Sequence, residues 1–218
     1  FGSLAHWILS KWDFSPDSLD EWVPENDAAA ARIVNAVPYG VRGEFRSPLS
    51  RHAIRSMLSE YAMSREGKNL AAMMTEKSGM TISRETPFRV LDRDLLMVGS
   101  TDIFWEDGEA LHLRDWKTTS EEDSPDLYYE EQLKFYAYAM HVFRKEKGLG
   151  QKNIETGINY LRGAPNKKNT VIMTEEMIRL TGDKIHEMAV RALSDSFEPV
   201  IEHCLKCPWS DICSKKHI

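Results

Sequence analysis

The segment "LHLRDWK", residues 111 to 117, constrains the fold most, because side chains alternate between the two faces of an extended strand. Leu111 and Leu113 give one face an apolar start, and Asp115 and Lys117 continue the same face with charges. This face therefore either emerges into solvent at Asp115 or enters a site that binds something. A solvated Asp-Lys pair is the simpler alternative, and other features of the chain must decide between the two.

The dipeptide Asp107-Gly108 predicts a hairpin between this strand and the preceding one. Asp-Gly favours a two-residue turn in which both residues have positive φ. Such a turn would set Asp102 opposite Leu113, and therefore diagonally across from Asp115 on the same face. Diagonal neighbours lie about 7 to 8 Å apart, with their side chains closer. Two carboxylates so placed could bind one cation whose oxygen ligands lie about 2.0 to 2.1 Å away.

The expected secondary structure has an α/β order. Helical patterns cover residues 1–12, 26–36, 48–75, 126–146 and 174–195, and strand-like runs cover 81–90, 94–105, 110–117 and the later segments "ETGINYLRG" and "NTVIMT". We predict a central mixed β-sheet flanked by helices. Residues 1–218 are interpreted as one domain, and residues 197–218 as its cysteine-rich C-terminal tail.

Composition sets limits on the class of protein. The chain has 218 residues, of which 42% are hydrophobic and 28% charged, which is enough for one sizeable core. No apolar run approaches the roughly 20 residues of a membrane span, and no signal peptide is recognisable, so we expect a cytoplasmic protein without a membrane partner. A net charge of −6 argues against a generally basic nucleic-acid-binding coat. Because the chain begins with Phe1 inside a helical pattern, we expect it to be part of a longer protein.

Several short patterns occur in a fixed order around this strand pair. They are GxxxH at Gly2–His6, GxxD at Gly99–Asp102, DxK at Asp115–Lys117, QxxxY at Gln132–Tyr136, FxP at Phe197–Pro199 and CxxCxxxxxC at Cys204–Cys213. In this order they resemble the PD-(D/E)xK nuclease superfamily. Within it they are most similar to the RecB-like branch, which includes RecB- and AddB-type helicase-nucleases and CRISPR-associated RecB-like exonucleases. The resemblance spans residues 2–213 and implies a restriction-endonuclease-like fold.

The resemblance also implies an activity and a site. The activity is Mg²⁺- or Mn²⁺-dependent DNA exonuclease cleavage, in DNA repair or recombination or beside a helicase domain or subunit. Catalytic roles are implied for Asp102, Asp115, Lys117, Gln132 and Tyr136. The implied metal ligands are His6, Asp102, Asp115 and the backbone carbonyl of Trp116. The alternative from another class is a non-catalytic DNA-binding or structural module.

Some of these residues also have simpler interpretations. His6 could be an ordinary helix histidine, and only the GxxxH match supports a ligand role. Glu85 ends a strand-like run and is interpreted as a solvated edge residue rather than a further acidic ligand. Trp105 and Trp116 fall on the strand face opposite Asp102 and Asp115, which predicts packing in the core rather than base stacking.

The three cysteines, Cys204, Cys207 and Cys213, lie in the last fifteen residues, an arrangement that does not suit a disulfide framework. The resemblance implies a four-iron, four-sulfur cluster, whose fourth cysteine would precede Phe1, so this chain would hold it incompletely. Zinc is the alternative, with His203 or His217 as a further ligand. Burial as small apolar side chains is the third interpretation.

Overall fold

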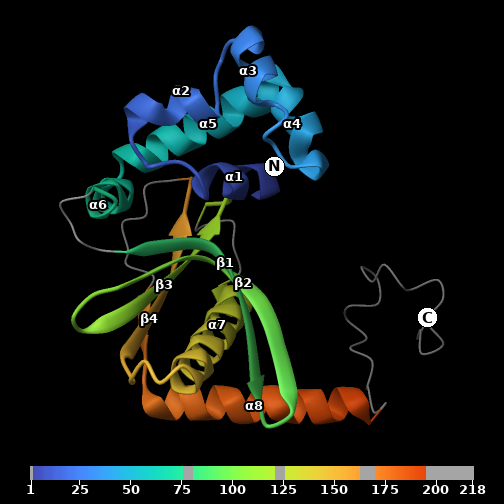
Figure 1. Ribbon diagram of the computed structural model, residues 1–218, viewed down its shortest axis with the longest axis vertical. Helices are drawn as coiled ribbons and strands as arrows, with labels where there is room; N and C mark the ends of the chain where they lie inside the picture. The colour runs from blue at the N-terminus through green and yellow to red at the C-terminus, as the bar shows by residue number, and fades with distance from the viewer. Residues whose placement is uncertain (1, 76–80, 121–125, 163–169, 195–218) are drawn as a thin grey trace.

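The computed structural model describes residues 2–75, 81–120, 126–162 and 170–194. The elements in chain order are α1 (Gly2–Leu9), η1 (Pro16–Ser18), α2 (Leu19–Trp22), α3 (Asp27–Ile33), η2 (Tyr39–Val41), α4 (Arg42–Arg46), α5 (Pro48–Met63), α6 (Arg65–Met73), β1 (Ile82–Asp92), β2 (Leu95–Glu106), β3 (Ala110–Lys117), α7 (Asp126–Glu146), β4 (Asn153–Tyr160), β5 (Thr170–Met173) and α8 (Glu175–Leu193). This is the predicted α/β order, with one mixed sheet flanked by helices, and it is consistent with the restriction-endonuclease-like fold (Figure 1). Within the described ranges, no helix is long and apolar enough to cross a membrane.

The sheet has five strands in the order β1-β2-β3-β4-β5. Neighbouring strands are antiparallel except β3 and β4, which are parallel and pair along their full length. Parallel neighbours need a long crossover connection, and α7 supplies it. The strand that carries Asp115 and Lys117 therefore lies in the centre of the sheet, and the helix that carries Gln132 and Tyr136 follows it directly.

Two hydrophobic cores cover the two faces of the sheet. Leu111 and Leu113 belong to a core that includes apolar residues of α7 and α8. Trp105 and Trp116 are buried in the other core, against α1 and α5, as predicted. Helices α1 to α6 gather at one end of the sheet, and α8 lies across the opposite end (Figure 1).

Side-chain caps explain where the longer helices begin. The hydroxyls of Ser47, Ser64 and Thr174 accept hydrogen bonds from backbone N–H groups in the first turns of α5, α6 and α8. The Ser64 cap separates α5 from α6, so the single helical pattern expected over residues 48–75 is two helices.

The predicted turn between β2 and β3 is wrong. Neither Asp107 nor Gly108 has a positive φ, and Glu106 pairs with Leu111. The Asp107 carboxylate instead accepts hydrogen bonds from the backbone N–H groups of Glu109 and Ala110, both at 2.8 Å. An aspartate that bonds its own backbone in this way stabilises a longer turn.

This turn shifts the register by two residues, which preserves the face of every side chain. Ile103 pairs with Arg114, so Asp102 lies directly across from Asp115 in the continued register instead of diagonal to it. The two-residue turn with positive φ joins β1 and β2, where Arg93 and Asp94 have φ of 47° and 68°.

Candidate active site

Three acidic side chains lie side by side across the first three strands. The continued register places Glu85 of β1 across from Asp102 of β2, and Asp102 across from Asp115 of β3. Residues directly opposite one another on antiparallel strands share a face. Asp102 and Asp115 are 8% and 3% exposed, so these carboxylates are largely withdrawn from water.

Asp102 holds the two strands together where their backbone pairing ends. Its Oδ2 accepts a hydrogen bond of 2.7 Å from the backbone N–H of Trp116. The backbone pairing of these strands ends at Ile103 with Arg114, so a carboxylate takes over the role of a strand partner beyond that point. Asp102 therefore has a structural contact in addition to any role in the site.

Lys117 is held by side chains from β3 and α7. Its Nζ lies 2.7 Å from Oδ2 of Asp115 and donates to Oε1 of Gln132 at 3.2 Å. Nε2 of Gln132 in turn donates to the hydroxyl of Tyr136 at 2.7 Å. The ring of Tyr129 lies 4.3 Å from the same Nζ, which is a cation–π contact. The structure thus joins the predicted DxK and QxxxY residues in one chain of contacts.

His6 reaches the same cluster from α1. Its Nε2 lies 3.0 Å from the backbone carbonyl oxygen of Trp116. Its Nδ1 lies 3.3 Å from Oε1 of Glu85 and 3.5 Å from Oδ1 of Asp102. One ring nitrogen therefore faces a main-chain acceptor, and the other faces two carboxylates.

Crowding of these charges shifts the pKa values of the cluster. Burial raises the pKa of Asp115 to about 6, and the charge of Asp102 adds to this effect against the opposing effects of Lys117 and His6. Burial lowers the pKa of His6, but Asp102 and Glu85 outweigh it and raise the pKa to about 10. The site therefore concentrates negative charge and favours a cation.

Glu85 is a site residue that the sequence interpretation missed. Its Oε1 is buried, and His6, Glu85 and Asp102 each offer a ligand atom within 4.8 Å of the others. Glu85 also has a φ of 43°, in the left-handed region that non-glycine residues rarely adopt. A strand-like pattern carries no sign of such a conformation. The one available signal was an acidic residue aligned with Asp102 across the hairpin.

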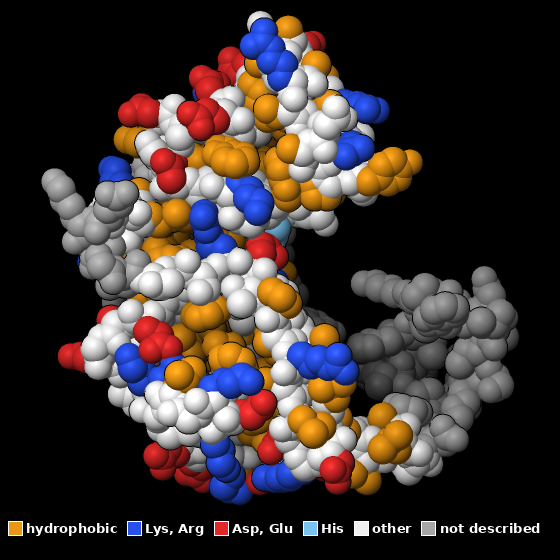
Figure 2. All heavy atoms as spheres, in the orientation of Figure 1, with side chains coloured by type: hydrophobic (Ala, Val, Ile, Leu, Met, Phe, Trp, Pro, Cys, Tyr) orange, Lys and Arg blue, Asp and Glu red, His pale blue; other side chains and the backbone are white. Residues whose placement is uncertain are grey.

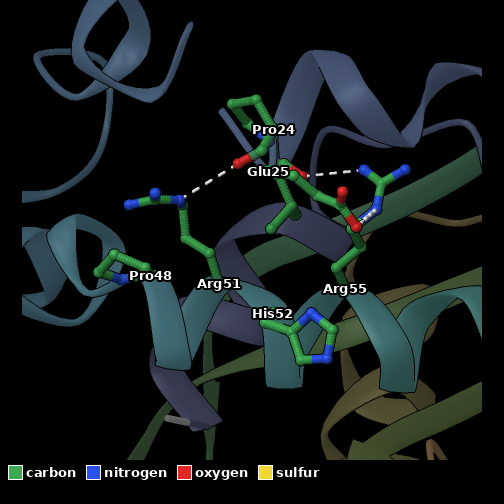
Figure 3. A pocket seen from close by; sticks show the side chains of 7 residues that line it. Pro24, Glu25, Pro48, Arg51, His52 and Arg55 are labelled. Atoms are coloured by element: carbon green, nitrogen blue, oxygen red, sulfur yellow. Dashed lines mark hydrogen bonds and ion pairs between the residues drawn. The ribbon is translucent and has the colours of Figure 1, made fainter. Parts of the chain in front are cut away.

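A recess of about 220 Å³ lies away from this cluster, between α5 and the segment before α3 (Figure 3). The guanidinium of Arg51 donates to the carbonyl oxygen of Pro24, and the guanidinium of Arg55 is paired with Glu25. These cations are already satisfied by the protein, so we assign the recess no part in the site.

The remaining predicted site residues are the three cysteines. Cys204, Cys207 and Cys213 lie outside the described residues.

Among the described residues on the face drawn in Figure 2, Lys and Arg side chains are interspersed with Asp and Glu and form no continuous basic surface. The charge pattern thus agrees with the net charge of −6.

Comparisons with known proteins give one family. The family model for the PD-(D/E)XK nuclease superfamily matches residues 1–214. No curated protein matches the chain. Among solved structures, the chain is similar to one described as "Crystal structure of SSO0001", with 13% sequence identity and a TM-score of 0.36, over 87% of this chain and 82% of that chain. Because the family model matches nearly the whole chain, this chain belongs to the PD-(D/E)XK nuclease superfamily.

Proposed function

We propose that this chain is a divalent-metal-dependent nuclease that hydrolyses phosphodiester bonds in DNA at the cluster of Asp102, Asp115 and Lys117. The observation that carries the proposal is the position of Lys117. Its ammonium lies 2.7 Å from a buried carboxylate, and its side chain is only 18% exposed. A lysine fixed beside carboxylates in a partly closed site is suited to stabilise negative charge on a phosphoryl group.

The side chains present fit a hard divalent cation. Carboxylate oxygens suit Mg²⁺ and Mn²⁺, and an imidazole nitrogen favours Mn²⁺. When bound, such an ion would lower the pKa of a coordinated water and neutralise charge on the substrate. The protein itself would position the reacting groups: Asp102 and Asp115 bind the cation, and Lys117 orients the attacking water and offsets charge. Gln132 holds the Lys117 ammonium in place.

A cleavage assay with matched lysine variants tests this proposal. Lys117→Ala should lower cleavage of a labelled DNA by at least about 100-fold, since its charge acts on the transition state. Lys134→Ala is the control. Lys134 lies on α7, the helix that contacts Lys117, and its ammonium pairs with Glu130 at 2.7 Å. That surface pair should change the rate by less than about twofold. Full activity of Lys117→Ala, or full activity of the wild type in EDTA, would exclude the mechanism.

The rival interpretation is a non-catalytic module. Burial of charged groups is unfavourable unless they are paired or bind an ion. A module that only binds DNA would gain nothing from Asp115 at 3% exposure with its pKa raised to about 6. Retention of DNA binding without cleavage at any concentration of Mg²⁺ or Mn²⁺ would favour the rival.

We further propose that cleavage starts at DNA ends, as the RecB-like order of motifs implies, and that a helicase domain or subunit delivers those ends. Linear DNA should then be degraded while covalently closed circular DNA of the same sequence stays intact. Nicking or linearisation of the circle would instead identify an endonuclease. Co-purification of a nucleic-acid-dependent ATPase with the protein would support the helicase partner.

For Cys204, Cys207 and Cys213 we propose a four-iron, four-sulfur cluster, with zinc as the alternative. Thiolates of cysteine are the usual ligands of both. Anaerobic purification of the protein tests this. A brown protein with iron and acid-labile sulfide supports the cluster, and a colourless protein with one equivalent of zinc supports the alternative.

A further inference from the structure

We infer that Tyr39, braced by Arg42, is a stacking platform for an unpaired base, and that Arg46 binds a phosphate of the same strand. This surface would hold single-stranded DNA on the helical end of the fold, outside the cluster around Lys117. The inference rests on the proposed function and specifies the form of DNA that the protein holds.

The ring of Tyr39 carries the first step. Tyr39 is 88% exposed, and among the described residues it is the only Phe, Tyr or Trp whose side chain is exposed. Aromatic rings have a large apolar area and contribute strongly to cores and interfaces. Exposure of a single apolar side chain is common and assigns no role by itself, so the surroundings of the ring must decide.

Arg42 holds the ring in place. The Cζ atom of Arg42 lies 5.9 Å from the centroid of the Tyr39 ring, which is a cation–π contact. Its Nε donates to the carbonyl oxygen of Val37 at 2.8 Å, and its Nη2 donates to that of Asn35 at 2.9 Å. The main chain thus fixes the guanidinium beside the ring, and most of the ring faces solvent. A ring that is already ordered loses little conformational entropy when a base stacks on it.

The charges around Tyr39 favour a polyanion. Between residues 28 and 59 the sequence has one acid, Glu44, and one oxygen of its carboxylate is buried. The same stretch has five arginines, in a chain whose net charge is −6: Arg32, Arg42, Arg46, Arg51 and Arg55. Arg51 and Arg55 pair with acids of the preceding segment, but among the described residues no acid pairs with the other three. Guanidinium groups without acidic partners are suited to bind phosphates.

Helix α4 aligns these groups and fixes them to the rest of the fold. Arg42 and Arg46 are four residues apart on α4, so they lie on one face of it. Phe45 is buried and makes an edge contact with Trp7 of α1, with ring centroids 6.5 Å apart (Figure 1). Trp7 follows His6, which belongs to the candidate active site. Helix α1 therefore joins the Tyr39 surface to that site.

Single-stranded DNA fits this surface better than a duplex does. Inside a duplex the faces of each base are covered by the neighbouring bases, so a protein ring cannot stack on them. Unpaired bases leave these faces free, and proteins that hold single strands combine aromatic rings with basic side chains. A protein partner is the other occupant that exposed tyrosine and arginine side chains suit, and the experiment separates the two.

Fluorescence anisotropy with a labelled oligothymidylate tests the role of Tyr39, in EDTA and with the whole chain. Tyr39→Ala should weaken binding by about fivefold or more, the contribution of one stacked base. Tyr39→Phe keeps the ring and should bind as the wild type does. Leu49→Ala is the matched control, because Leu49 is 83% exposed on the neighbouring α5 but has no ring. Affinity for a blunt duplex should change by less than about twofold in every variant.

The salt dependence of binding tests the role of Arg46. Release of counterions makes the logarithm of the binding constant fall linearly with that of the salt concentration, with a slope of about −0.7 per neutralised phosphate of a single strand. Arg46→Gln should therefore make the slope shallower by about 0.7, and Tyr39→Ala should leave it unchanged. Arg179→Gln is the control, because Arg179 is an exposed arginine of α8 that pairs with Asp183 at 2.9 Å.

Wild-type affinity of Tyr39→Ala for the oligothymidylate, an equal loss in Leu49→Ala, or a wild-type slope for Arg46→Gln overturns the inference. So does a Tyr39→Ala variant that binds the oligothymidylate normally but loses a co-purifying protein, because the surface would then serve a protein partner. Both measurements follow binding without metal. A chain that binds the strand as inferred but cleaves no DNA would therefore count only against the proposed function.

Discussion

The ring of Phe88 lies directly over the backbone of Gly99, its partner across β1 and β2. A Cβ at Gly99 would come within 2.5 Å of Cζ of Phe88. The same ring makes an edge contact with Tyr136, with centroids 6.1 Å apart. The glycine of the GxxD pattern therefore leaves room for a ring that supports the QxxxY tyrosine. The chain of contacts continues from Tyr136 through Gln132 to Lys117.

Gly99→Ala should disturb the active site indirectly. The new methyl group must displace Phe88, and overpacking of this kind destabilises a protein by about 1–3 kcal/mol. We expect lower thermal stability and slower DNA cleavage, because the displaced ring pushes on Tyr136. Adding Phe88→Leu should restore both. Wild-type melting and cleavage by the single variant would contradict this link.

Tyr129 should matter for catalysis through its ring and not its hydroxyl. The ring lies 4.3 Å from Nζ of Lys117 and covers one side of the ammonium. Cation–π contacts contribute about 0.5–2 kcal/mol, so Tyr129→Leu should lower kcat by about two- to thirtyfold. Tyr129→Phe keeps the ring face and should retain kcat. Equal loss in both variants would assign the effect to the hydroxyl instead.

The sequence predicted those features that depend on local pattern. The alternation through Leu111, Leu113 and Asp115 gave the core face of β3, and the face of Asp102 was right although the turn was wrong. A shift of two residues preserves the face, so the error in the turn did not affect the juxtaposition of Asp102 and Asp115. The predicted bounds of the helix at residues 126–146 match α7, Asp126–Glu146.

Features that depend on contacts between distant segments could not be predicted from local sequence patterns. The left-handed backbone of Glu85 follows Arg84, whose guanidinium donates to the carbonyl oxygen of Leu9 at the end of α1, 75 residues earlier. The contact of Tyr129 with Lys117 depends on how α7 packs against β3. Asp107 misled the turn prediction because its side chain bonds to two backbone N–H groups, an option that the Asp-Gly pattern does not reveal.

Asp102 and Asp115 should have opposite effects on the stability of the metal-free protein. Asp102→Ala leaves the backbone N–H of Trp116 without its acceptor, which should destabilise the fold by about 1–3 kcal/mol. The folded-state pKa of Asp115, about 6, lies above its ordinary unfolded value of about 3.9. Ionised Asp115 therefore opposes folding, and Asp115→Asn should stabilise the protein by on the order of 1 kcal/mol at pH 7.

The pH dependence of that gain checks its origin. A group with a raised acid pKa destabilises the folded state fully above its folded pKa and not at all below its unfolded pKa. Denaturant titrations in EDTA should therefore show the full gain from Asp115→Asn above pH 6 and none below about pH 4. A gain that is independent of pH would point to packing and not to charge.

Ionised Asp92, far from the active site, should stabilise the folded protein, in contrast to ionised Asp115. Its Oδ2 accepts hydrogen bonds from the hydroxyl of Tyr138 at 2.5 Å and lies 2.8 Å from Nε2 of His186, so it joins the β1–β2 hairpin to α7 and α8. Burial raises the pKa of Asp92, but these two contacts outweigh it and hold the pKa below its ordinary value. A lowered acid pKa stabilises the fold above the unfolded pKa, and that contribution is lost as the pH falls through the folded one.

Asp92→Asn should therefore destabilise the protein by about 1 kcal/mol at pH 7, the typical contribution of a hydrogen bond. The difference from wild type should shrink as the pH falls below about 4, where the wild-type carboxylate also becomes protonated. Asp183→Asn is the matched control, because Asp183 on α8 pairs with Arg93 and Arg179 at the surface and should matter little. DNA cleavage should be unchanged in both variants, since the cluster at Asp92 shares no contact with Lys117 among the described residues. A deficit for Asp92→Asn that stays constant from pH 7 to pH 3 would show that its carboxylate charge is not what stabilises this junction.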